Sequence, residues 1–240
     1  MGALDRASAD YDKALQLEPK NVAAYVNRGF AYIAEKQYKR AISDLDAALR
    51  LQPDDFPAYR NRATAYRSLG QYDKAAADYA SALRINPKDP IVRYESGRTK
   101  FQLGDFAGAV DDLSQSLSAL PNQPYTVIWL YLAGARSGTP NAGRLAADAA
   151  KVDGKAWPAP IISLFEGSSS VAAVESVAAI GGGRSKAVKA CETALYVGEY
   201  RLLKADRPGA EQSFQRAVTA CPSGLFEHDA AQEELRRLTG

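Results

Sequence analysis

Four prolines follow one another at a fixed distance in this chain of 240 residues. Pro19, Pro53, Pro87 and Pro121 each stand 34 residues from the next. Proline lacks the N–H that a helix interior needs, so it is tolerated just beyond a helix end. A fixed period of this length is typical of chains built from stacked supersecondary units. The sequence therefore predicts an array of repeated units.

The residues between the prolines keep the same step. Aromatic, leucine and small residues recur 34 positions apart: Tyr25 and Tyr59; Gly29, Ala63 and Gly97; Tyr32 and Tyr66; Tyr38, Tyr72 and Phe106; Ala41, Ala75 and Ala109; Leu45, Tyr79 and Leu113. Apolar and small positions lie three and four apart within a unit, as one buried helix face requires. Each unit is predicted to be a helical hairpin, and Gly70 and Gly104 are expected in two of the turns.

These residues resemble the tetratricopeptide repeat, a 34-residue helix–turn–helix unit. The resemblance implies an all-α fold, a right-handed superhelical solenoid of helical hairpins with a closing carboxy-terminal helix. We expect one continuous solenoid in four segments: a truncated half-repeat consisting of the second helix only at 1–20, three repeats at 21–123, degenerate hairpins at 124–183, and a last repeat with the closing helix at 184–240.

The first segment matches only the second helix of a unit. We therefore expect the sequence to begin inside a longer natural chain. Stacked repeats bury their faces only on their neighbours, so Leu4, Ala7, Tyr11 and Leu15 would form a partly bare stripe. The stripe predicts a homodimer formed through this helix.

The rarer residues limit the chemistry. A net charge of +2 argues against general nucleic-acid binding. His228 is the only histidine, and no serine or cysteine nucleophile lies at a spacing from it that is typical of a catalytic site. Asp111 and Asp112 are adjacent on a helix and so point apart, which prevents them from sharing a proton or a metal ion. The longest apolar run, 127–133, is far shorter than the ~20 residues that span a bilayer. We predict a protein with no catalytic residues, no metal and no cofactor, whose partners are proteins or peptides.

Cys191 and Cys221 each lie fifteen residues from Asp206, in the turn of the last hairpin. Residues equidistant from the turn of an antiparallel hairpin face each other, which is the geometry a disulfide requires. Such a bridge would stabilise the fold by about 3.5 kcal/mol on the chain-entropy model and would imply an oxidising compartment. The alternative is two free thiols that pack as small hydrophobic groups.

A closer resemblance rests on the segment Trp157-Pro158-Ala159-Pro160, the run Tyr196-Val197-Gly198-Glu199-Tyr200 and the ending Phe226-Glu227-His228. These residues resemble the new lipoprotein I type of bacterial tetratricopeptide protein. The resemblance implies a periplasmic adaptor that links a protease to cell-wall hydrolases and is anchored in the outer membrane by a lipid. No lipobox cysteine is present in the sequence, so a lipid anchor would belong to a missing amino terminus.

First helices of such repeats line a concave groove. From the helical spacing we expect eight residues to form a partner-binding groove: Asn27, Phe30, Arg60, Asn61, Thr64, Arg67, Tyr94 and Arg98. Asparagine amides can hydrogen-bond to an extended peptide backbone, and arginine forks fit carboxylates. The pattern predicts a peptide partner with acidic or carboxy-terminal carboxylate groups, with Glu95 as the one opposing charge.

A cytosolic co-chaperone or assembly module is the alternative binding function. Arg60 and Asn61 resemble the clamp that holds chaperone tails in some cytosolic tetratricopeptide proteins. Phe30 and Thr64 stand where that clamp would have a second amide, and Ile91 and Glu95 where it would have basic groups. Free thiols would distinguish this alternative from an adaptor of the cell envelope.

Overall fold

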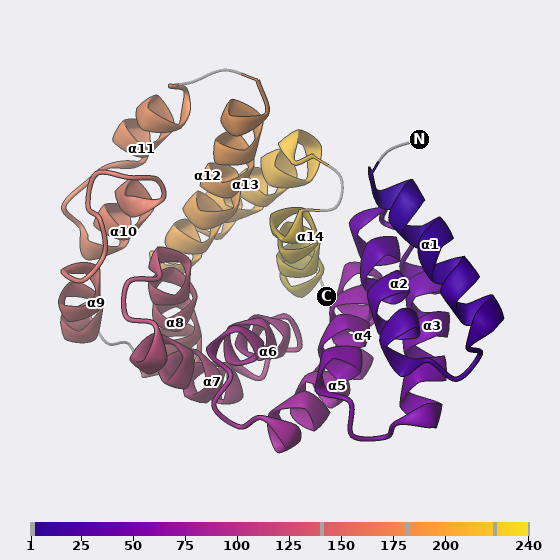
Figure 1. Ribbon diagram of the computed structural model, residues 1–240. Coiled ribbons are helices and arrows are strands. Elements are labelled where there is room, and N and C mark those ends of the chain that lie inside the picture. Colours follow the sequence, from indigo (N-terminus) through magenta and orange to yellow (C-terminus); the bar gives the residue numbers. More distant parts are fainter. Residues whose placement is uncertain (1–2, 140–141, 181–182, 223–224, 240) are drawn as a thin grey trace. The chain divides into compact units, whose positions relative to one another are not determined.

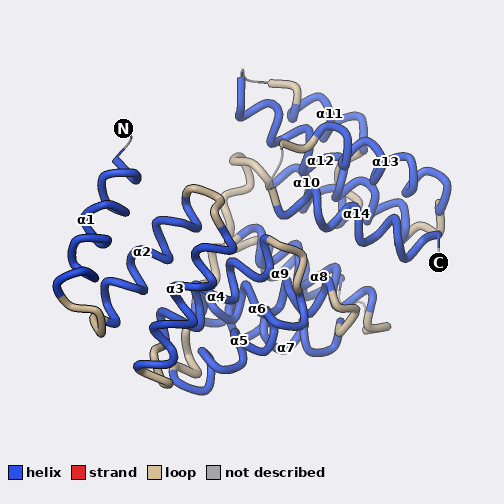
Figure 2. Tube along the Cα trace, turned by 90° about the vertical axis from the view of Figure 1, so that its right-hand side faces the viewer, coloured by secondary structure: helices blue, strands red, loops and turns tan. Residues whose placement is uncertain are grey.

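A computed structural model describes residues 3–139, 142–180, 183–222 and 225–239. These residues form helices joined by short loops and contain no strand (Figures 1 and 2). The chain divides into two compact units, Met1–Gly104 and Asp105–Gly240, which are described separately. The prediction of an all-α fold is confirmed, and the helix that closes it packs on the hairpin before it.

From residue 3 onward, the first unit consists of six helices that stack in chain order (Figure 1). They are α1 (Ala3–Leu17), α2 (Val22–Ala34), α3 (Tyr38–Leu51), α4 (Phe56–Ser68), α5 (Tyr72–Ile85) and α6 (Pro90–Gln102). Asn21, Asp55 and Asp89 stand 34 residues apart, and each accepts a hydrogen bond from a backbone N–H in the first turn of the helix it precedes. Such caps satisfy amides that the helix leaves without a partner. Gly70 and Gly104 adopt positive φ angles of 70° and 78° in the predicted turns.

Two arginines, one on α2 and one on α4, each pair with carboxylates on the helix before and the helix after their own. Arg28 on α2 pairs with Asp12 on α1 at 2.6 Å and holds Asp44 on α3 through two bonds of 2.7 Å. The same contacts recur 34 residues later, where Arg62 on α4 pairs with Asp46 on α3 and with Asp78 on α5. These carboxylates raise the pKa of both guanidinium groups. Bidentate pairs of this kind fix orientation as well as distance.

The amino-terminal helix does not expose the whole predicted stripe. Leu15 is 9% exposed, so it faces the neighbouring helix, whereas Leu17 is 84% exposed. Tyr11 is half-buried, and the side chains of Leu4 and Ala7 lie outside the described part of the structure. Self-association through α1 stays a prediction.

The described residues of the second unit form eight helices. They are α7 (Phe106–Ala119), α8 (Pro124–Arg136), α9 (Ala142–Ala149), α10 (Ala159–Glu166), α11 (Val171–Ala178), α12 (Gly183–Leu203), α13 (Arg207–Ala220) and α14 (Phe226–Thr239). Helix α8 is buried on most sides, and its Trp129 meets the rings of Tyr196 and Phe226 edge-on at 5.8 and 5.4 Å between centroids. Edge-to-face pairs at this separation are favourable beyond the area they bury.

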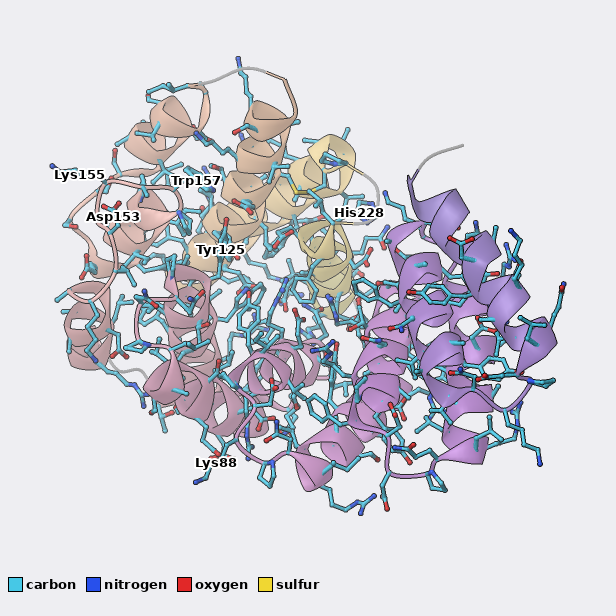
Figure 3. All side chains as sticks on the ribbon, in the orientation of Figure 1. Lys88, Tyr125, Asp153, Lys155, Trp157 and His228 are labelled. Carbon is cyan, nitrogen blue, oxygen red and sulfur yellow. A yellow bond between two sulfur atoms is a disulfide. The ribbon has the colours of Figure 1, made fainter. Side chains whose placement is uncertain are left out.

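The tryptophan–proline segment is attached to the core through Glu192. The hydroxyl of Tyr125 donates to both oxygens of this buried carboxylate, at 3.0 and 3.1 Å, and Trp157 Nε1 donates to one of them (Figure 3). The contact joins three elements that lie far apart in the sequence: α8, the loop before α10, and α12. Glu192 therefore has a structural role in placing this loop.

The two cysteines form a disulfide, as the symmetry of the hairpin predicts. Cys191 on α12 is bonded to Cys221, which follows α13, with 4.7 Å between the Cα atoms. Helices α12 and α13 also pack against each other along their length. The bridge joins the middle of α12, eight residues after the helix begins at Gly183, to the residue that follows α13, and so ties the two helices of the hairpin together.

An ionic network lies inside the second unit. Arg136 pairs with Glu199 at 3.3 Å and with Glu234 at 2.9 Å, and Glu234 also pairs with Arg237. Glu199 is 0% exposed. Burial and the neighbouring Glu234 raise the pKa of Glu199 to about 8, although Arg136 and Arg237 lower it in part. Burial therefore favours the protonated form of Glu199 in the folded protein.

We predict that Glu199→Gln removes a pH dependence of stability. The pKa of Glu199 lies above its ordinary value of 4.5 in the folded chain, so the folded state holds a proton that the unfolded state has lost between pH 4.5 and about 8. The free energy of unfolding should fall as pH rises through this window, by at most about 1.4 kcal/mol per pH unit. Urea unfolding across the window measures this slope. Glu166→Gln, at an exposed glutamate, should keep it, whereas an unchanged slope in Glu199→Gln would contradict the assignment.

Glycine at 198 allows the closest helix approach in the last hairpin. A Cβ added there would lie 2.5 Å from Cε1 of Phe214, whose side chain is fully buried. Gly198→Ala should lower the free energy of unfolding by about 1–3 kcal/mol through overpacking. Gly143→Ala, on a helix where an added Cβ meets nothing within 4 Å, should raise it by about 0.5–1 kcal/mol. Thermal unfolding of both variants measures the difference, and equal stability would contradict the close approach.

Candidate functional site

The layer formed by α2, α4 and α6 contains a hollow of about 170 Å³ in the first unit. It is lined by two residues of α2, three of α4 and three of α6: Phe30, Ile33, Arg60, Asn61, Thr64, Ile91, Val92 and Glu95. The first helices of three consecutive hairpins thus contribute to one concavity. Four of the eight predicted groove residues line it: Phe30, Arg60, Asn61 and Thr64.

The hollow lies between two exposed apolar side chains. Phe30 is 57% exposed and Ile91 is 56% exposed, which is unusual for residues of this size. They belong to α2 and α6, with α4 between them. Exposed apolar groups at the edge of a concavity are typical of a binding surface. Ile91 is not among the predicted groove residues, although it shares a helix face with Glu95, four residues later.

Asn61 is the central polar group of the hollow. It is 6% exposed as a whole residue, and its side-chain amide makes no hydrogen bond to a described residue. Because no side chain of the fold engages it, this amide is available to a ligand that enters the hollow. An amide offers both a donor and an acceptor, which matches an extended peptide backbone.

Arg60 supplies the positive charge of the hollow. Its guanidinium stacks on the ring of Phe56, with 6.0 Å to the centroid, and pairs with no carboxylate of the described residues. Thr64, in contrast, is already engaged: its hydroxyl donates to the carbonyl of Arg60 at 3.1 Å and lies 3.3 Å from the hydroxyl of Tyr79. Arg60 therefore provides the site for a ligand carboxylate, and Thr64 is part of the wall.

Two of the predicted arginines serve the interior instead. Arg67 and Arg98 both pair with Glu95, at 3.4 and 3.8 Å, and neither lines the hollow. Burial lowers the pKa of Arg67, but Glu95 and Tyr79 outweigh it and leave that pKa above its ordinary value. Of the three arginines that were expected to bind carboxylates of a partner, only Arg60 therefore lines the hollow. The sequence identifies Glu95 as an opposing charge. It does not indicate that this one carboxylate pairs with both Arg67 and Arg98.

The remaining predicted residues lie outside the hollow. Asn27 is exposed on α2, and Tyr94 is half-buried with the guanidinium of Arg98 over its ring at 5.1 Å.

His228, on α14, hydrogen-bonds through Nδ1 to the neighbouring Asp229 at 3.0 Å (Figure 3). Among the described residues, no three His, Cys, Asp or Glu side chains are grouped so as to hold a metal ion. No helix in this part of the chain is long and apolar enough to cross a membrane.

Family models match the first 135 residues of the chain. Residues 1–35 match a model described as TPR repeat, and residues 30–93 and 66–135 match two models described as tetratricopeptide repeat. These are repeat families, and none is a family of enzymes. No protein of curated function matches the sequence.

Solved structures of repeat proteins have the same fold. A tetratricopeptide repeat protein from Parabacteroides merdae is 18% identical, with a TM-score of 0.65, and the match covers 99% of this chain and 93% of that one. YrrB, described as a TPR protein with an unusual peptide-binding site, is 15% identical, with a TM-score of 0.55 and coverage of 94% and 97%. PilW, a type IV pilus biogenesis factor, is 19% identical, with a TM-score of 0.56 and coverage of 90% and 85%. At these identities the likeness concerns the fold.

Proposed function

Because this chain is a tetratricopeptide-repeat protein, we propose that it is a non-catalytic adaptor that binds an extended peptide in the hollow of α2, α4 and α6. The observation that carries the proposal is the hollow itself, in which the Asn61 amide has no hydrogen-bond partner among the described residues and the exposed side chains of Phe30 and Ile91 contribute to the lining. YrrB, of similar fold, is described as having a peptide-binding site.

The chemistry of the hollow defines the peptide. Phe30, Ile33 and Ile91 favour apolar side chains, because contact removes their exposed surface from water. Asn61 hydrogen-bonds to the peptide backbone, and Arg60 binds an acidic side chain or a terminal carboxylate. We therefore expect a segment that combines apolar residues with one or two carboxylates. Arg67 and Arg98 act indirectly, by holding Glu95 in the wall.

Two substitutions test the hollow with a panel of fluorescent octapeptides that vary in apolar and acidic content. Arg60→Glu should weaken binding of the acidic peptides at least tenfold and leave neutral ones nearly unchanged, because it reverses one charge. Asn61→Ala should weaken both classes about tenfold while stability changes by less than about 1 kcal/mol, because the amide has no internal partner. Fluorescence anisotropy measures the affinities.

Arg50→Glu is the matched control, because this arginine is exposed on α3 and lies outside the hollow. It should bind every peptide as the wild type does. If the panel binds equally well to all three variants, the peptide site lies on another face of the chain.

We also propose that the protein works in the periplasm, with the anchor and the protease–hydrolase adaptor role that the resemblance to the new lipoprotein I group implies. The disulfide between Cys191 and Cys221 supports an oxidising compartment over the cytosolic alternative, since thiols stay reduced in the cytosol. Capture from an envelope extract on immobilised protein, with Asn61→Ala as control, tests the role. Proteases and wall hydrolases should be retained by the wild type and reduced on the variant.

The redox state of the protein in its cell tests the compartment. Protein isolated after rapid alkylation should carry no label on Cys191 or Cys221, and reduction before alkylation should add two labels. Mass spectrometry of the intact chain counts them. Two labels without reduction would contradict the periplasmic proposal and favour the cytosolic co-chaperone or assembly module.

A further inference from the structure

A second hollow lies in the second unit, where α11, α12 and α13 pack together (Figure 1). Its volume is about 330 Å³. Five alanines make up most of its lining: Ala178, Ala179, Ala190, Ala194 and Ala220. Small apolar side chains on three neighbouring helices leave space that larger ones would fill, and the size suits a small molecule.

Two polar groups of α12 face this hollow without a partner in the described chain. Lys186 is exposed and makes no ion pair or hydrogen bond there. Thr193 is 4% exposed, and its hydroxyl has no hydrogen-bond partner. A buried hydroxyl of this kind is unfavourable unless something else satisfies it.

The spacing of these groups sets the length of a ligand. Lys186 and Thr193 are seven residues apart, two turns along one face of α12, which places their backbones about 10 Å apart. Ala190 lies between them on the same face. A molecule along this face would meet a cation first, then an apolar stretch, then a hydroxyl.

The charges at the rim favour an anion. Glu175 on α11 and Arg216 on α13 pair with each other at 3.3 Å and so offset one another. Lys186 is left as the uncompensated charge among the lining residues. The walls are also held in place, because Ala190 and Ala220 directly precede the two cysteines of the disulfide.

We propose that this hollow binds a small amphipathic carboxylate about 10 Å long. Its carboxylate pairs with Lys186, its aliphatic body lies over the alanines, and a hydroxyl or carbonyl at its far end hydrogen-bonds to Thr193. The ligand class is thus a medium-chain hydroxy or oxo carboxylic acid. The site is separate from the peptide hollow and does not depend on it.

Three probes that differ in one group each test the proposal on the oxidised full chain. They are 8-hydroxyoctanoate, octanoate and 1,8-octanediol, and isothermal titration calorimetry measures their affinities. We expect saturable binding, tightest for 8-hydroxyoctanoate, about tenfold weaker for octanoate and weakest for the diol. Absence of saturable binding for all three would overturn the proposal. A diol that binds as tightly as the hydroxy acid would overturn the assignment of a carboxylate.

Variants separate a ligand site from a packing defect. Lys186→Gln should weaken both carboxylates about tenfold, whereas Lys88→Gln, an exposed lysine in the first unit, should not. Thr193→Val should remove the advantage of 8-hydroxyoctanoate over octanoate while the chain stays at least as stable as the wild type. Ala190→Leu adds volume at an exposed wall position, so it can block the hollow without disturbing the core. Full affinity in Ala190→Leu would overturn the proposed location.

Discussion

The close approach of two helices at one small residue determines the geometry of each hairpin. Gly29 faces Leu45 and Gly198 faces Phe214, sixteen positions later in both cases, and an added Cβ at either glycine would lie under 3.0 Å from the opposing side chain. Leu45 and Phe214 are fully buried as a result, and burial of one such side chain contributes about 1.5–3 kcal/mol. In the first unit, α2, α4 and α6 each contribute residues to the peptide hollow.

The polar groups of the first unit divide into satisfied and unsatisfied ones. Arg28 and Arg62 each hold two aspartates, and Arg67 and Arg98 surround Glu95, so these charges stabilise the stack. The side-chain amide of Asn61 has no such partner among the described residues. Because this amide lines the hollow, its donor and acceptor are available to a ligand.

The second unit uses the same hairpin principle with less regular elements. Short helices α9, α10 and α11 replace full-length ones, and polar contacts such as those of Glu192 attach the loop between α9 and α10 to the core. The disulfide ties the middle of α12 to the residue after α13, and alanines on α11, α12 and α13 line most of the second hollow. The two hollows differ in chemistry. The first offers the Asn61 amide and the Arg60 guanidinium beside apolar side chains, and the second is mostly aliphatic, with the Lys186 cation and the Thr193 hydroxyl as its polar groups without a partner in the described chain.

The sequence by itself determined the repeat, the helical hairpins and the glycine turns, because periodicity and turn chemistry are local properties of a chain. It favoured the pairing of Cys191 with Cys221 over two free thiols, and the structure contains that disulfide. It also placed Phe30, Arg60, Asn61 and Thr64 on one face, since helical spacing fixes a face. Only the tertiary structure decided that Glu95 engages Arg67 and Arg98, that Ile91 completes the wall, and that Asn61 lacks a partner. Those facts depend on distances between side chains of different helices, and a single helical pattern contains no information about them.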